Sequence, residues 1–172
     1  MLSTVLMLAM AATKTVAPSA ALESPTRHIR SAFPYVNSLL KDGFYKSPTF
    51  ARLVARLEHS DLIVYVEMVP QMPAGVEGRL VMLPRAHETR YVRIQIGQQG
   101  STSDAIALLG HELQHATELA DAPNVIDLDG FVALYERIGQ RSGWHQYETA
   151  AAQDAARQVR SECARSAARI VD

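Results

Sequence analysis

The chain has 172 residues, of which 48% are hydrophobic and 20% charged, and its formal net charge is −1 at pH 7. This length suits one domain with a sizeable core, and the composition excludes a disordered, collagen-like or coiled-coil protein. The near-neutral charge gives no electrostatic basis for binding nucleic acid, so no nucleic-acid partner is expected. A single cysteine, Cys163, excludes an intrachain disulfide framework and is expected to be a buried small residue on the last helix.

Residues 1–12 form an apolar run that is too short to span a bilayer, so no stable membrane span is expected. Small residues follow at 17 and 19–21, and the arrangement resembles a secretory signal peptide that lacks the usual positive charge at its start. We therefore expect residues 1–21 to be a signal peptide and residues 22–172 to form a single domain in the periplasm or outside the cell. The alternatives are a frayed apolar tail or a buried first helix, and the protein would then be cytoplasmic.

The pattern of apolar residues in the rest of the chain predicts an α+β domain. Ser47 can cap a helix with Pro48 in its first turn, and Leu62–Met68 is rich in the residue types that favour strands. Short links between strands favour a small, mainly antiparallel or mixed sheet packed on helices. The expected elements are a loop over 24–48 with a short helical piece at 35–40, a helix at 48–57, strands at 62–68, 79–83 and 91–96, and helices at 101–120, 128–138 and 146–170.

The chemistry lies in the segment His111-Glu112-Leu113-Gln114-His115, an H-E-x-x-H motif on the expected helix 101–120. Histidines four residues apart stand one helical turn above each other, so both imidazoles can reach one Zn²⁺ ion. Glu112 is placed to accept a proton from water at the metal without being a ligand itself. The alternative is an exposed amphipathic helix that carries two histidines by chance. The metal site is favoured by an apolar stripe on the opposite side of the helix from both histidines. Burial of this stripe would anchor the helix and leave the histidines facing a cleft. The stripe consists of Leu109, Leu113, Ala116 and Ala120.

A catalytic zinc ion usually has three protein ligands, and two glutamates compete for the third position. Glu148 opens the expected last helix, above a face of small residues that would let this helix pack closely against His111 and His115. A glutamate at such a place is rarely buried unless it is paired or bound to metal, although the helix dipole also favours one there. Glu118 lies seven residues after His111 and is the alternative ligand, or a solvated or supporting group.

The H-E-L-Q-H segment on a helix after a small sheet, with a glutamate on a later helix, resembles the gluzincin class of zinc metallopeptidases. That class implies a zincin-like fold, with the H-E-x-x-H helix and a C-terminal helix supplying the ligands. The resemblance implies that His111, His115 and Glu148 bind Zn²⁺ and that Glu112 is the general base. It also implies that an edge strand, for which 91–96 is the candidate, aligns a peptide or protein substrate.

The sequence departs from the gluzincin pattern beside the third ligand. Many gluzincins have Asn before the ligand glutamate and Asp four residues after it, where this chain has Tyr147 and Ala152. The carboxylate that orients a zinc-binding histidine is therefore sought elsewhere, at Asp104, Asp127 or Asp129. The candidates for stabilising an oxyanion are Tyr135, His145 and Tyr147. His28, His59 and His87 are expected to be ordinary surface histidines, and Trp144 is expected to anchor the loop between two helices.

Two classes of function follow. The first is a zinc-dependent metallopeptidase that hydrolyses peptide bonds with a zinc-activated water. The second is a non-catalytic zincin-like protein that binds metal or a partner. The short chain favours the second class, because it leaves little material for a deep cleft. The intact Glu112 favours the first class, since a purely structural zinc site needs no base beside it.

Overall fold

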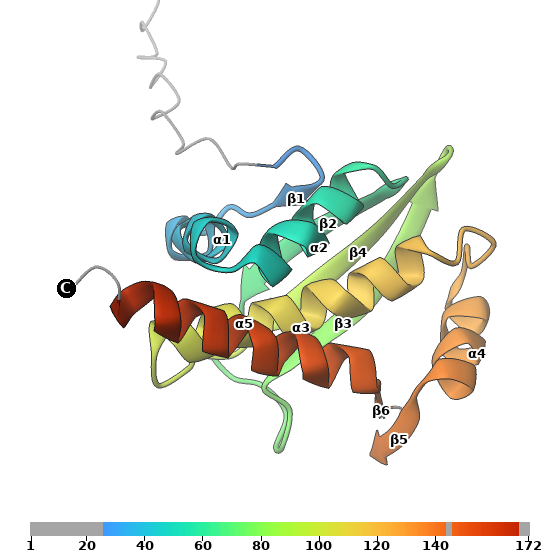
Figure 1. The fold of residues 1–172 in the computed structure, drawn as a ribbon. Coiled ribbons are helices and arrows are strands. Elements are labelled where there is room, and N and C mark those ends of the chain that lie inside the picture. The colour runs from blue at the N-terminus through green and yellow to red at the C-terminus, as the bar shows by residue number, and fades with distance from the viewer. Residues whose placement is uncertain (1–25, 144–145, 169–172) are drawn as a thin grey trace, which may run out of the picture.

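The computed structural model describes residues 26–143 and 146–168 (Figure 1). The expected signal peptide at 1–21, Trp144 and His145 lie outside these residues. The alternation of helices and strands confirms the α+β class. The elements in chain order are β1 (Ile29–Arg30), α1 (Pro34–Lys46), α2 (Pro48–Glu58), β2 (Leu62–Met68), β3 (Gly78–Ala86), β4 (Thr89–Ile96), α3 (Thr102–Ala120), α4 (Leu128–Ile138), β5 (Gln140–Gly143), β6 (Gln146–Glu148) and α5 (Ala150–Ala168).

The main sheet is mixed, with the strand order β1-β2-β4-β3. The pairs β1–β2 and β2–β4 are parallel, whereas β3 and β4 form an antiparallel pair. The strand at 91–96 is therefore an interior strand, because β4 is hydrogen-bonded on both sides. The expectation that it forms the substrate-aligning edge is wrong, and β3 holds the edge position. The short 87–88 link makes β3 and β4 a hairpin, which leaves the other side of β4 to β2.

The core lies between one face of this sheet and the helices. Along β4 every second side chain, including Val92, Ile94 and Ile96, is fully buried against the helices, as the period of a strand requires. Figure 1 shows α1, α2 and α3 on that face, with α5 lying along α3. Among the described residues, no helix combines the length and apolar character needed to cross a bilayer.

Helix α3 is enclosed on more sides than a single apolar stripe predicts. The expected residues Leu109, Leu113 and Ala116 are fully buried, but so is Ala107 on another side of the helix. A Cβ at Gly110 would lie 3.0 Å from Val159 Cγ2 of α5, so the two helices are in close contact there. The motif histidines thus project from a helix that is held between the sheet and α5.

Two expectations about helix bounds are wrong. The segment predicted as a loop contains the 13-residue helix α1, which runs through Gly43. A Cβ at Gly43 would lie 2.9 Å from the ring of Phe50, so this glycine permits α1 and α2 to touch and does not break the helix. The last helix begins at Ala150 instead of 146, because residues 140–143 and 146–148 form the paired strands β5 and β6.

Two buried charged groups tie helix ends to the rest of the fold. Arg90, whose side chain is 1% exposed, donates to both carboxylate oxygens of Asp61 at 2.7 Å. The same guanidinium donates to three carbonyl groups after the end of α3 or in its last turn, those of Leu119, Ala122 and Val125. This interaction satisfies carbonyls that a helix C-terminus leaves without partners.

At the start of α2, the carboxylate of Glu162 on α5 accepts hydrogen bonds from the Ser47 hydroxyl (2.5 Å), the Thr49 hydroxyl (2.9 Å) and the Thr49 backbone N–H (2.9 Å). A carboxylate at a helix N-terminus also interacts favourably with the helix dipole. Cys163, the next residue, is buried as expected.

Candidate metal centre

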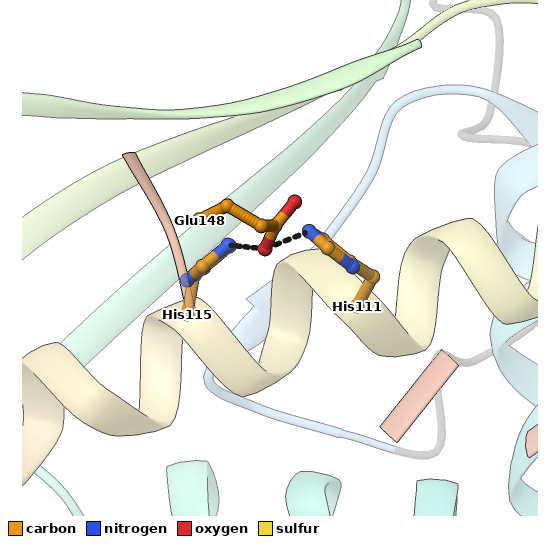
Figure 2. A group of neighbouring side chains, drawn as sticks. All are labelled: His111, His115 and Glu148. Carbon is orange, nitrogen blue, oxygen red and sulfur yellow. Dashed lines mark ion pairs between the residues drawn. The ribbon is translucent and has the colours of Figure 1, made fainter. Parts of the chain in front are cut away.

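The two motif histidines lie on consecutive turns of α3. Ser101 caps this helix by accepting a hydrogen bond from the Asp104 backbone N–H, and the helix then continues without interruption to Ala120. The rings of His111 and His115 are 4.9 Å apart between centroids and almost perpendicular. Figure 2 shows both rings on the same side of α3, facing Glu148.

Glu148 reaches the histidines from β6. Its Oε1 lies 3.2 Å from His111 Nε2 and 3.5 Å from His115 Nε2. One ligand atom from each residue lies within 4.8 Å of the other two (Figure 2). The structure therefore brings together all three residues that the sequence proposes as ligands. It corrects one detail, because Glu148 ends a strand and does not open the last helix.

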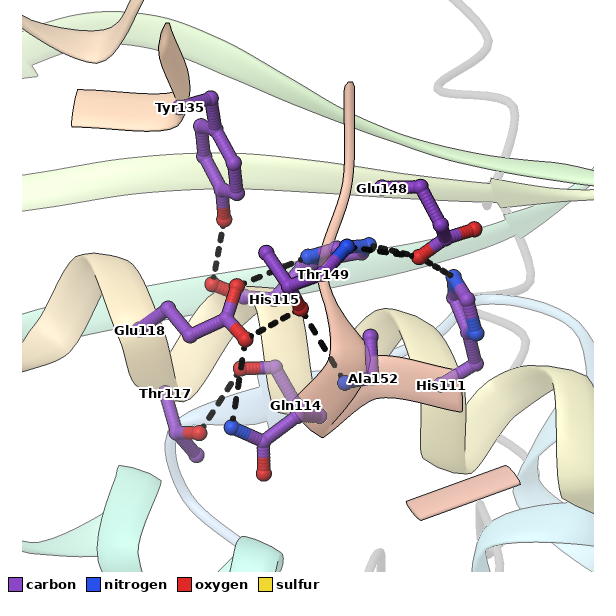
Figure 3. Close-up of polar contacts among 9 residues, drawn as sticks. All are labelled: His111, Gln114, His115, Thr117, Glu118, Tyr135, Glu148, Thr149 and Ala152. Carbon is purple, nitrogen blue, oxygen red and sulfur yellow. Dashed lines mark hydrogen bonds and ion pairs between the residues drawn. The ribbon is translucent and has the colours of Figure 1, made fainter. Parts of the chain in front are cut away.

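Glu118, the alternative ligand, lies on the other side of His115. Its Oε2 is 2.9 Å from His115 Nδ1, so the carboxylate accepts a hydrogen bond from the ring nitrogen that faces away from Glu148 (Figure 3). Glu118 is outside the three-residue cluster and takes the orienting place that the sequence analysis sought at Asp104, Asp127 or Asp129. Among those residues, Asp104 pairs with Arg160 and Asp127 caps α4. The three-residue spacing between His115 and Glu118 on one helix is the sequence feature that indicates this contact.

The expected oxyanion-stabilising tyrosines have their hydroxyl groups engaged elsewhere. The buried Tyr135 donates to the backbone carbonyl of His115 at 2.8 Å, and its ring packs edge-on against that histidine at 5.4 Å. The Tyr147 hydroxyl lies 3.1 Å from Glu136 Oε1. His145 lies outside the described residues. The side chains of His59 and His87 are exposed as expected, whereas His28 is half-buried, with Nδ1 3.1 Å from the Leu62 carbonyl.

Glu112 is buried beside the cluster, with only 3% of the residue exposed. Among the described residues, its Oε2 has no hydrogen-bond partner. Its other oxygen approaches the backbone of Gly78 at the start of β3, where a Cβ would lie 2.5 Å from Oε1. Burial raises the pKa of Glu112 to about 7, although the nearby His115 and His111 act to lower it.

The electrostatics of the cluster are those of a histidine–carboxylate network. Burial acts to lower the pKa of His115, but hydrogen bonds to Glu118 and Glu148 outweigh it and raise the pKa to about 9. Burial likewise acts to raise the pKa of Glu148, but hydrogen bonds from both histidines lower it to about 2. A carboxylate and two imidazoles within reach of one point are a donor set that suits Zn²⁺. The residues present therefore fit such an ion.

Comparison of this chain with protein-family models, curated proteins and solved structures found no significant match. The interpretation of the centre consequently depends on its geometry and chemistry. An open pocket of about 500 Å³ is lined by residues of the 70–77 and 97–100 loops. One lining residue, Glu77, directly precedes Gly78, and its carbonyl accepts a hydrogen bond from the Gly97 N–H at 2.8 Å.

Proposed function

We propose that this chain is a zinc-dependent metallopeptidase of the gluzincin type, with a zincin-like fold. The observation that carries the proposal is the convergence of His111, His115 and Glu148 beside the buried carboxylate of Glu112. Nε2 of each histidine and a carboxylate oxygen of Glu148 would hold the ion. When bound there, Zn²⁺ supplies Lewis-acid activation of water and of the scissile carbonyl group.

In this proposal Glu112 is the general base. It accepts the proton of the attacking water and returns it to the leaving amine, so the proton moves through one carboxylate in both steps. Burial favours this role, because it raises the pKa of Glu112 to about 7 and so makes the carboxylate a stronger base near neutral pH. Glu112 Oε2 has no hydrogen-bond partner among the described residues, so it can accept a hydrogen bond from a water molecule that reaches it. Glu118 holds the ring of His115 so that Nε2 points to the metal position.

The substrate in this proposal is an extended peptide that lies along β3. This strand has β4 on one side only, so its other edge can form hydrogen bonds with a peptide backbone. β3 begins at Gly78, beside the Glu112 carboxylate, so a peptide paired with the start of this strand would have a peptide bond close to the base. The pocket beside Glu77 offers room for a substrate side chain. We also infer that residues 1–21 direct export, so that the substrate is met in the periplasm or outside the cell.

One observation favours the second function, a metal-binding protein without catalysis. The hydroxyl groups of Tyr135 and Tyr147 are both already hydrogen-bonded, which leaves the oxyanion without these two candidate donors. A protein of this second kind would keep the metal and would not use Glu112 as a base.

Two variants of the full chain distinguish these functions. Glu112→Gln keeps the size of the side chain but removes the base, so we expect its zinc content to equal that of the wild type and its rate of peptide hydrolysis to fall by at least ~10²-fold. His115→Ala removes a ligand and should lose zinc and activity together. His59→Ala, which changes an exposed histidine, serves as the control for both measurements.

Zinc content is measured by atomic emission and hydrolysis with a peptide library, with and without chelator. A wild-type protein that binds zinc but cleaves no peptide supports the second function. A wild-type protein that binds no zinc overturns both.

A further inference from the structure

Thr149 stands between the two carboxylates that surround His115. It follows Glu148 directly, precedes α5 and is only 4% exposed. Its backbone N–H donates to Glu148 Oε1 at 3.0 Å, the oxygen nearest both histidines. Its hydroxyl donates to Glu118 Oε1 at 2.7 Å (Figure 3). One residue therefore contacts both the third ligand and the carboxylate that orients a ligand.

The orientation of the Thr149 hydroxyl is fixed by two different partners. Its proton is directed to Glu118, and its oxygen accepts the Ala152 backbone N–H at 3.1 Å, which caps α5. Gln114 Nε2 is the other neighbour of Glu118 Oε1, at the longer distance of 3.4 Å. The Glu118 carboxylate is 10% exposed, so water has limited access to replace a lost hydrogen bond. Loss of the Thr149 hydroxyl would leave the Glu118–His115 pair less well held.

We propose that Thr149 is a positioning residue, which holds the side chain of Glu118, and through it the ring of His115, in place relative to the Glu148 carboxylate. The inference rests on the proposed metal centre. The hydroxyl of Thr149 fixes Glu118, Glu118 fixes the Nδ1 side of His115, and the Thr149 backbone fixes the Glu148 oxygen that Nε2 faces. Its effect is on the geometry of the ligands, and it touches neither the metal position nor the substrate.

The test is the zinc dissociation constant of the full chain, measured by competition with a chromophoric chelator. Thr149→Val keeps the β-branched shape and removes the hydroxyl, so we expect zinc to bind about 10- to 100-fold more weakly. Thr149→Ser keeps the hydroxyl and should restore affinity to within about threefold of the wild type. The absorption spectrum of the Co²⁺-substituted protein should change in Thr149→Val and return to that of the wild type in Thr149→Ser.

A second set of variants separates positioning from helix capping. Asp127→Ala removes the cap of a different helix, α4, and should leave zinc affinity unchanged. The combination of Thr149→Val with Glu118→Gln should weaken binding by less than the product of the two single effects, since both act through one carboxylate.

The outcomes are distinguishable. If the wild type binds zinc and Thr149→Val binds it equally well, the role of Thr149 is wrong and the metal centre stands. Independent effects of Thr149→Val and Glu118→Gln would also overturn the positioning role. A wild type that binds no zinc overturns the proposed function itself.

Discussion

Gly78 on β3 and Glu112 on α3 meet without a side chain between them, since a Cβ at position 78 would lie 2.5 Å from Glu112 Oε1. The carboxylate is buried, so it cannot give way by swinging into solvent. Glycine at this position therefore allows the edge strand to approach the proposed base directly.

Gly78→Ala is expected to displace the Glu112 carboxylate and to slow peptide hydrolysis by ~10-fold or more, because small misplacements of a reacting group are costly in rate. Zinc content should not change, because Glu112 is not a ligand. The control is Glu88→Ala, which changes an exposed side chain beyond the other end of β3. Equal activity in the two variants would contradict a close fit between β3 and the base.

Arg90→Lys is expected to destabilise the fold by about 3 kcal/mol, because a lysine cannot replace the two bonds to Asp61 together with those to three backbone carbonyls. The free energy of unfolding is measured with urea. Arg56→Lys changes an exposed arginine that pairs with Asp121 and should cost less than about 1 kcal/mol. A loss as small as that of the control would show that the buried network contributes little.

The Glu162 carboxylate predicts a pH dependence of stability. Burial acts to raise its pKa, but the hydrogen bonds from Ser47 and Thr49 outweigh this effect and lower the pKa. A group with a lowered pKa stabilises the fold above its unfolded pKa, and this contribution is lost as the pH falls through its folded pKa. Glu162→Gln should therefore reduce the free energy of unfolding by ~1–3 kcal/mol at neutral pH, and by less below about pH 4.

The measurement is urea unfolding of the wild type and Glu162→Gln at several pH values. Glu88→Gln, which changes an exposed glutamate with a long contact to Arg85, is the control and should show little difference at any pH. If the deficit of Glu162→Gln were the same in acid as at neutral pH, the charge of Glu162 would not be what stabilises the start of α2.

A chain that begins at Leu22 is expected to fold with a melting temperature within about 2 °C of the full chain. The reason is that the hydrophobic core of the described residues is built from side chains between Ile29 and Cys163. Thermal unfolding followed by circular dichroism checks this, and a fusion of residues 1–21 to a reporter active only outside the cytoplasm checks export. A large loss of stability would favour the buried first helix instead.

The sequence predicts those elements whose pattern is local. The strand Leu62–Met68 and the helix Leu128–Ile138 have the expected bounds, because each has a clear period and clear ends. Only residues 35–40 of α1 are predicted, because Gly43 is a helix breaker in local terms, whereas in the fold it lets α1 contact Phe50, seven residues away. The edge position of β3 is missed because pairing between distant strands leaves no mark in either strand alone.

The candidate site also combines features that the local sequence pattern predicts with features that depend on distant parts of the chain. The spacing of His111 and His115 suffices to place both rings together, because the helix between them is regular. Glu148 is predicted beside the histidines on the argument of a helix face, but it reaches them from β6, so its position is as expected and the element that carries it is not. For Glu118, spacing brings the carboxylate near His115, but the hydrogen bond that its other oxygen accepts comes from Thr149, 31 residues further along the chain.

The three side chains of the proposed metal site differ in how firmly the protein holds them. The histidines belong to α3, which lies between the sheet and α5, whereas Glu148 ends a strand of three residues that pairs with β5. Side chains on a packed helix keep their positions better than those on a short ribbon. Ions that differ in radius or preferred geometry require ligand atoms to move. In the proposed metal site the histidines would give an incoming ion two fixed points, so adaptation to a metal other than zinc would fall to Glu148. Metal selectivity would then be a property of the paired strands β5 and β6.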